Sequence, residues 1–142
     1  PKAKITTPST AAIKALKKLK IKKIAIFTPY SKKLNGEIID YFSSQGFDIV
    51  ANTYLDIAAD YDIGKVDQNF LLETLSQIEI KNADALFISC TALPVLNIIE
   101  RLEKELGKPV ITSNQSLIWD TLESIDMNKN ILGFGKLFNL DQ

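Results

Sequence analysis

The 142-residue sequence contains no histidine and a single cysteine. The absence of histidine excludes, within this chain, His-ligated zinc, a Ser-His-Asp triad and a Cys-His dyad. One cysteine excludes an internal disulfide and a metal site built from several cysteines. Basic and acidic residues both number 17, so the formal net charge is zero and favours no nucleic-acid or polyanion partner. We therefore expect no metal site and no nucleic-acid partner.

Three further kinds of signal are missing. No apolar run approaches the roughly 18 residues of a membrane span, and no signal-peptide pattern opens the chain. Neither a G-x-G-x-x-G fingerprint nor a Walker pattern follows any predicted strand, which disfavours a nicotinamide, flavin or nucleotide cofactor. Hydrophobic residues make up 46% and charged residues 24%, as in an ordinary globular domain. The sequence thus predicts a cytoplasmic protein without membrane contact.

What the sequence does contain is a regular alternation of short apolar runs and amphipathic stretches. A first helix is expected after a cap at Ser9 or Thr10. Four apolar runs then predict strands, each followed by a helical pattern, at 24–27, 48–55, 85–88 and 110–112. Such alternation is typical of a parallel sheet covered on both faces. The predicted fold is therefore α/β, a four-stranded parallel sheet with helices on both faces, flavodoxin-like or Rossmann-like.

Charged residues on the predicted helices have two interpretations. Six lysines lie between Lys14 and Lys23, on or just after the first predicted helix. They are compatible with a phosphate-binding patch, although a solvated helix face is the simpler interpretation. On the helix that follows strand 85–88, Glu100 and Lys104 are spaced to form an exposed ion pair.

Polar side chains follow each predicted strand. Open parallel sheets bind ligands at the carboxyl ends of their strands, so these segments are the expected site. They comprise residues 28–30, 56–62, 89–91 and 113–115. Ser, Thr, Asn and Asp also favour loops and helix caps, so each group alone is weak evidence for a site. The stronger evidence is that all four groups occur at the same edge of the sheet.

Cys90 is the most informative residue at this edge. It follows a buried strand and, in the predicted arrangement, directly precedes a helix. A helix N-terminus favours a thiolate, and free N–H groups such as those of Thr91 and Ala92 can hold an anion. Such a thiol can be a nucleophile or a proton carrier, the alternative being a buried structural cysteine. Tyr30 is interpreted either as a ligand donor or as a core or rim tyrosine. Asn114 is interpreted either as a ligand donor or as a helix cap.

Five short motifs occur along the chain in a recognisable order. They are Thr28-Pro29-Tyr30, Ser89-Cys90-Thr91, Gly107-Lys108-Pro109-Val110, Ser113-Asn114-Gln115 with Trp119, and Gly133-Phe134-Gly135-Lys136-Leu137. In this order and spacing they resemble the maleate cis-trans isomerase branch of the aspartate/glutamate racemase superfamily, which also includes arylmalonate decarboxylases and ectoine-utilisation proteins. The resemblance covers about residues 6 to 137.

The resemblance implies a site that works without cofactor or metal on a small carboxylate substrate. Cys90 matches the cysteine of the second lobe, which gives and takes a proton or assists the nucleophile. Tyr30 matches a tyrosine that hydrogen-bonds a substrate carboxylate, and Thr91 adds a backbone N–H to the anion site. Asn114 matches an asparagine at the cleft edge. The neighbouring Thr28 and Ser89 are expected to line the same substrate site.

The family has two lobes, and its other cysteine lies upstream of the point where this chain begins. The resemblance therefore implies a C-terminal fragment, inactive alone, of a protein that forms a homo-oligomer. We expect residues 1–22 to form a helix leading from the missing lobe, 23–126 the C-terminal lobe, and 127–142 a tail that packs on the missing lobe. Without that lobe, the apolar stretch 131–138 should be exposed or drive self-association.

The expected function is that of a cofactor-independent, cysteine-dependent isomerase or racemase of small dicarboxylates or related carbon acids. In the isomerases a thiolate adds to maleate, the new single bond rotates, and elimination gives fumarate. The racemases use two thiols as acid and base. One alternative is a decarboxylase that needs only the cysteine matching Cys90, as in arylmalonate decarboxylases. The other is a non-enzymatic α/β module that binds a small anion.

Overall fold

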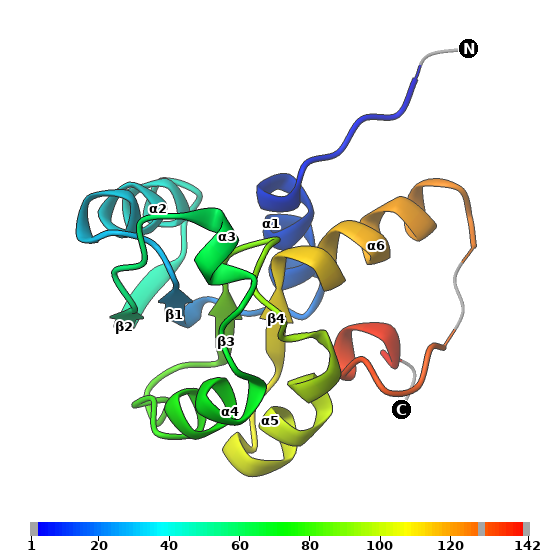
Figure 1. The fold of residues 1–142 in the computed structure, drawn as a ribbon. Helices are drawn as coiled ribbons and strands as arrows, with labels where there is room; N and C mark the ends of the chain where they lie inside the picture. The colour runs from blue at the N-terminus through cyan, green and yellow to red at the C-terminus, as the bar shows by residue number, and fades with distance from the viewer. Residues whose placement is uncertain (1–2, 128–129, 141–142) are drawn as a thin grey trace.

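The fold is an α/β layer structure, seen in a computed structural model that describes residues 3–127 and 130–140 (Figure 1). Its elements, in chain order, are α1 (Pro8–Lys18), β1 (Lys23–Thr28), α2 (Lys32–Ser44), β2 (Asp48–Tyr54), α3 (Asp60–Ile63), α4 (Gln68–Ser76), β3 (Ala85–Ile88), η1 (Leu96–Ile98), α5 (Ile99–Leu106), β4 (Val110–Thr112), α6 (Ser113–Ser124) and η2 (Lys136–Phe138). The four strands form a parallel sheet in the order β2-β1-β3-β4. The predicted fold class is confirmed. No helix of the described ranges is long and apolar enough to cross a membrane.

Two hydrophobic clusters sandwich the sheet because successive side chains of a strand point to opposite faces. In β1, Ala25 and Phe27 face the cluster formed with α4 and α5, whereas Ile24 and Ile26 face α1, α2 and α6. All four side chains are fully buried. Figure 1 shows α4 and α5 together on one side of the sheet and α1, α2 and α6 on the other. Helices thus cover both faces, as the apolar strands predicted.

The first helix starts earlier than the predicted cap at Ser9 or Thr10. Thr7 is the cap, and its hydroxyl oxygen accepts the Thr10 N–H at 3.2 Å. Pro8 occupies the first turn, where its fixed φ and missing N–H cost nothing.

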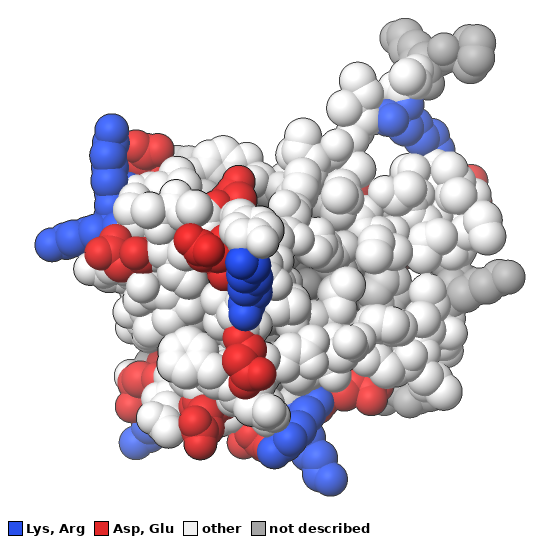
Figure 2. Space-filling view, in the orientation of Figure 1, with Lys and Arg blue, Asp and Glu red and all other residues white. Residues whose placement is uncertain are grey.

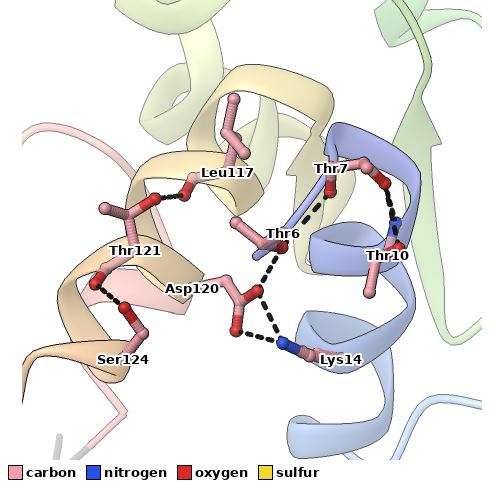
Figure 3. Close-up of polar contacts among 8 residues, drawn as sticks. All are labelled: Thr6, Thr7, Thr10, Lys14, Leu117, Asp120, Thr121 and Ser124. Atoms are coloured by element: carbon pink, nitrogen blue, oxygen red, sulfur yellow. Dashed lines mark hydrogen bonds and ion pairs between the residues drawn. The ribbon is translucent and has the colours of Figure 1, made fainter. Parts of the chain in front are cut away.

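Helices α1 and α6 are joined by a nearly buried carboxylate (Figure 3). Asp120 on α6 is 5% exposed and accepts two hydrogen bonds from Lys14 Nζ on α1, at 2.8 and 2.9 Å. The Thr6 hydroxyl donates to the same carboxylate. Small buried residues of α1, Ala11, Ala12 and Ala15, line the helix that α6 packs against. The pair therefore fixes α1 to α6.

The tail is bound by α5 and α6 through its backbone. Glu100 accepts the Gly133 N–H at 2.8 Å, and Glu103 accepts the N–H groups of Lys136 at 2.9 Å and of Val110 at 3.0 Å. Gln115 Nε2 donates to the Phe134 carbonyl at 2.6 Å. The predicted pair of Glu100 with Lys104 is therefore not present. The ion pair of this helix joins Arg101 and Glu105 at 2.9 Å.

Because its backbone is satisfied in this way, the tail reaches the hydrophobic core. Leu137 and Phe138 are buried with Ile111 and Trp119. The prediction of an exposed tail is wrong for these two residues, whereas Leu132 is 73% exposed. Whether the tail also packs on a second lobe stays a prediction.

Charge is unevenly spread over the face of the molecule that Figure 2 shows. Figure 2 shows acidic and basic side chains over the side that carries α2 to α5 and a largely uncharged surface over α6. Ile118 and Ile125, in and just after α6, are exposed large hydrophobic residues.

Candidate active site at the carboxyl ends of the strands

Strand register brings three of the predicted site segments to one edge. Phe27 of β1 pairs with Ile88 of β3, and Ile88 pairs with Thr112 of β4. The segments that follow these strands, 28–30, 89–91 and 113–115, therefore leave the sheet side by side. The fourth segment begins beside them, since Thr28 pairs with Tyr54 at the end of β2.

Cys90 is nearly buried, and one side chain and one backbone N–H hold it in its turn. Its N–H donates to the Ser113 hydroxyl oxygen at 3.1 Å, and its Sγ accepts the Ala92 N–H at 3.3 Å. The free cysteine is 4% exposed.

The predicted helix directly after Cys90 is absent. Residues 91–95 form an irregular turn, the 3₁₀ turn η1 begins at Leu96, and α5 begins only at Ile99. A helix dipole acts only within its first turn, so it does not reach this thiol. The Ala92 N–H does contact the sulfur, although it comes from the turn itself. The prediction was wrong about the helix because Pro94 disfavours helical backbone at the residue before it.

Tyr30 and Ser89 meet Cys90 at this edge. Burial raises the pKa of the Tyr30 hydroxyl well above its ordinary value of 10.0, and the neighbouring Cys90 side chain adds to the effect. The neighbouring Ser89 hydroxyl lowers this pKa, and the nearby Asp60 carboxylate raises it further. Tyr30 therefore remains a neutral phenol near pH 7 and can donate a hydrogen bond to a carboxylate oxygen.

The other predicted residues have structural partners at the same edge. The buried Thr28 hydroxyl donates to Asn35 Oδ1 on α2 at 2.9 Å, so this donor is already engaged. Asn114 Nδ2 donates to the Thr91 carbonyl at 2.8 Å and links the first turn of α6 to the Cys90 turn. Asn114 is not the helix cap. That role belongs to Thr112, which forms a reciprocal capping box with Gln115.

Sequence reasoning assigned no individual role to two residues that hold the site. Ser113 accepts the Cys90 N–H, and its place in the motif Ser113-Asn114-Gln115 was the signal that could have found it. Asn35 anchors Thr28 from α2, and nothing in the sequence distinguished it from an ordinary helix residue.

The lysine-rich segment lies at the opposite edge of the sheet, where β1 and β2 begin. Lys17, Lys20 and Lys22 line a surface hollow of about 350 Å³ together with Ile21 and residues 45–47. It is separate from the Cys90 edge. Among residues 3–127 and 130–140, no group of three or more Cys, Asp or Glu side chains is placed to hold a metal ion.

A family model described as arylmalonate decarboxylase matches residues 3–138. The chain belongs to the arylmalonate decarboxylase family. The maleate isomerase of Geobacillus stearothermophilus is 28% identical over 138 residues, which cover 96% of this chain and 55% of that protein. The chain spans about half the length of the curated relatives it matches.

Two solved structures share the arrangement of this arylmalonate decarboxylase family member. A Cys-to-Ala variant of the Pseudomonas putida S16 maleate isomerase with maleate matches at a TM-score of 0.91 and 27% identity, over 94% of this chain and 54% of that one. A Nocardia farcinica maleate cis-trans isomerase with a covalently bound succinylcysteine intermediate shares the fold at a TM-score of 0.91 and 24% identity, over 95% and 56%. The predicted resemblance to this superfamily is confirmed.

Proposed function

We propose that this chain carries one cysteine of a cofactor-independent isomerase or racemase that acts on small dicarboxylates or related carbon acids. The observation that supports it most is the placement of the Cys90 thiol at the ligand-binding edge, beside a neutral Tyr30 hydroxyl and the Ala92 N–H. Relatives of the chain are maleate isomerases, and maleate is therefore the first substrate to test.

In this proposal the residues have distinct roles. Tyr30 donates a hydrogen bond to a substrate carboxylate, and the Thr91 N–H adds a second donor. Cys90 gives and takes the proton at the substrate carbon. Asn114 borders the cleft, and Ser89 lines it beside Tyr30.

The isomerisation itself forms and breaks one carbon–sulfur bond. A thiolate adds to one alkene carbon, and the electron pair of the double bond moves to the neighbouring carbon, where the adjacent carboxylate delocalises it. The Cys90 thiol protonates that carbon, and rotation then occurs about the resulting single bond. The Cys90 thiolate takes a proton back from the same carbon, and the electron pair of that carbon–hydrogen bond re-forms the double bond and expels the nucleophilic thiolate, which leaves the trans isomer. Since this chain has one cysteine, the nucleophilic thiol comes from outside these 142 residues if Cys90 handles the proton.

Decarboxylation is the second candidate, favoured by the family model. A malonate derivative loses carbon dioxide and leaves an enediolate, and the Cys90 thiol protonates its carbon. This reaction needs no second thiol.

The test uses the complete protein encoded by the reading frame that contains this chain. Proton NMR follows maleate and phenylmalonate separately, with wild-type protein, Cys90→Ser and the buried-serine control Ser116→Ala. We expect maleate to convert to fumarate, Cys90→Ser to abolish conversion, and Ser116→Ala to leave it unchanged. Conversion of phenylmalonate alone would select decarboxylation. If neither maleate nor phenylmalonate reacts, and the protein still binds them after Cys90→Ala, the result supports a non-enzymatic module that binds a small anion.

A further inference from the structure

Two side chains in the first turn of α6 fasten the Cys90 turn from outside. Ser113 Oγ accepts the Cys90 N–H at 3.1 Å, in a buried contact. Asn114 Nδ2 donates to the Thr91 carbonyl at 2.8 Å. Consecutive backbone groups of the cysteine turn are therefore held by consecutive residues of one helix.

This helix start is itself rigidly fixed. Gln115 N–H donates to Thr112 Oγ1 at 3.2 Å, and Thr112 N–H donates to Gln115 Oε1 at 3.0 Å. The Gln115 amide also binds the tail through the Phe134 carbonyl. Ser113 and Asn114 thus project from a turn whose backbone is hydrogen-bonded on both sides.

The position of the Cys90 turn determines how the Ala92 N–H contacts the Cys90 sulfur. The turn that Ser113 fixes is the one that keeps the Ala92 N–H at 3.3 Å from Cys90 Sγ. If the Cys90 backbone moves, the Ala92 N–H is no longer held in hydrogen-bonding position toward the sulfur. Tyr30, in the segment that follows β1, lies beside the same side chain.

We propose that Ser113 is a positioning residue for Cys90, with Asn114 as its second anchor: by accepting the cysteine N–H, Ser113 keeps the 90–92 turn in the conformation that aims the Ala92 N–H at the thiol sulfur. The positioning of Cys90 by Ser113 does not depend on which reaction the protein catalyses. Only the use of the positioned thiol in catalysis rests on the proposed function.

The chain offers a matched control for this proposal. Ser116 lies one turn along the same helix, is fully buried, and its hydroxyl oxygen has no hydrogen-bond partner among the described residues. Ser116→Ala therefore removes a buried hydroxyl of the same helix without touching the cysteine turn.

The experiment measures the rate at which iodoacetamide alkylates Cys90 in the complete protein, quantified by mass spectrometry of the Cys90 peptide at one fixed pH, and it needs no substrate. The rate reports how often the turn opens and exposes the buried thiol. For Ser113→Ala we expect the rate to rise by roughly fivefold, the factor that corresponds to the loss of one hydrogen bond. Ser113→Thr, which retains the hydroxyl, and Ser116→Ala should keep the wild-type rate.

An unchanged alkylation rate in folded Ser113→Ala, or an equal increase in Ser116→Ala, overturns the proposal. If Ser113→Ala does not fold, Asn114→Ala decides, because Asn114 is only partly buried and holds the same turn. A smaller increase of the alkylation rate supports the proposal, and an unchanged rate contradicts it. Because alkylation is independent of turnover, these outcomes stand whether or not maleate is converted.

Discussion

Gly135 is the position where one added methyl group should be most damaging to the tail. Its backbone has φ 85° and ψ 179°, a conformation that is accessible almost only to glycine. A Cβ added there would lie 2.5 Å from Ile99 Cγ2, 3.1 Å from Glu103 Oε1 and 3.2 Å from Gln115 Nε2. The substitution Gly135→Ala therefore combines backbone strain with a steric clash against three groups that bind the tail.

The two effects can be separated by a neighbouring glycine. Gly133 also has a positive φ, 95°, but an added Cβ there meets nothing within 4 Å. Strain alone costs about 1–2 kcal/mol, and forcing an extra carbon into a packed site costs about 1–3 kcal/mol more. We expect Gly133→Ala to lower the free energy of unfolding by about 1 kcal/mol and Gly135→Ala by about 3 kcal/mol.

Urea unfolding followed by circular dichroism measures both values, and thermal unfolding gives a second reading. For a domain of this size about 1 kcal/mol corresponds to roughly 4 °C in Tm, so the two variants should differ by about 8 °C. Equal losses in the two variants would refute the reasoning, because they would show that the tail does not contact Ile99, Glu103 and Gln115 in solution.

Two further predictions concern charged groups. Burial raises the pKa of Glu103 above 4.5, so the folded chain keeps a proton that the unfolded chain has lost, and the free energy of unfolding should fall as pH rises from 4.5 through the raised pKa. Urea unfolding over a pH series should show this slope, and Glu103→Gln should abolish it; a slope that survives the substitution contradicts the assignment. Asp120→Ala removes the carboxylate that joins α1 to α6 and should cost about 1–2 kcal/mol, because its lysine partner is half exposed, whereas the exposed Glu73→Ala on α4 should cost nearly nothing. Equal effects of the two variants in the same assay count against the α1–α6 contact.

The regular part of this fold was predictable because it depends on local pattern. Continuous apolar runs such as 85–88 can only be buried on both faces, which leads to a parallel sheet and hence to a ligand edge at its carboxyl ends. The cap at Thr7 could also have been predicted, because proline is common in the first turn of a helix. Pro8 therefore indicates a start before Ser9.

The remaining features depend on contacts between distant segments. Glu100 is separated from Gly133 by 33 positions, and only the folded chain shows that the carboxylate binds a backbone N–H rather than Lys104. The irregular turn after Cys90 is likewise held by Ser113, 23 positions later. Periodicity describes one element at a time and carries no information about such side-chain-to-backbone bonds.

Protection of Cys90 by a substrate tests the central claim most directly. The complete protein is alkylated with iodoacetamide at increasing concentrations of maleate, and mass spectrometry quantifies the peptide that contains Cys90. The account predicts a saturable loss of alkylation with maleate and none with the neutral compound succinamide, because in the proposed site Tyr30 and the Thr91 N–H bind a carboxylate beside the thiol. A rate of Cys90 alkylation that does not change at any maleate concentration would contradict the assignment of this edge as the substrate site.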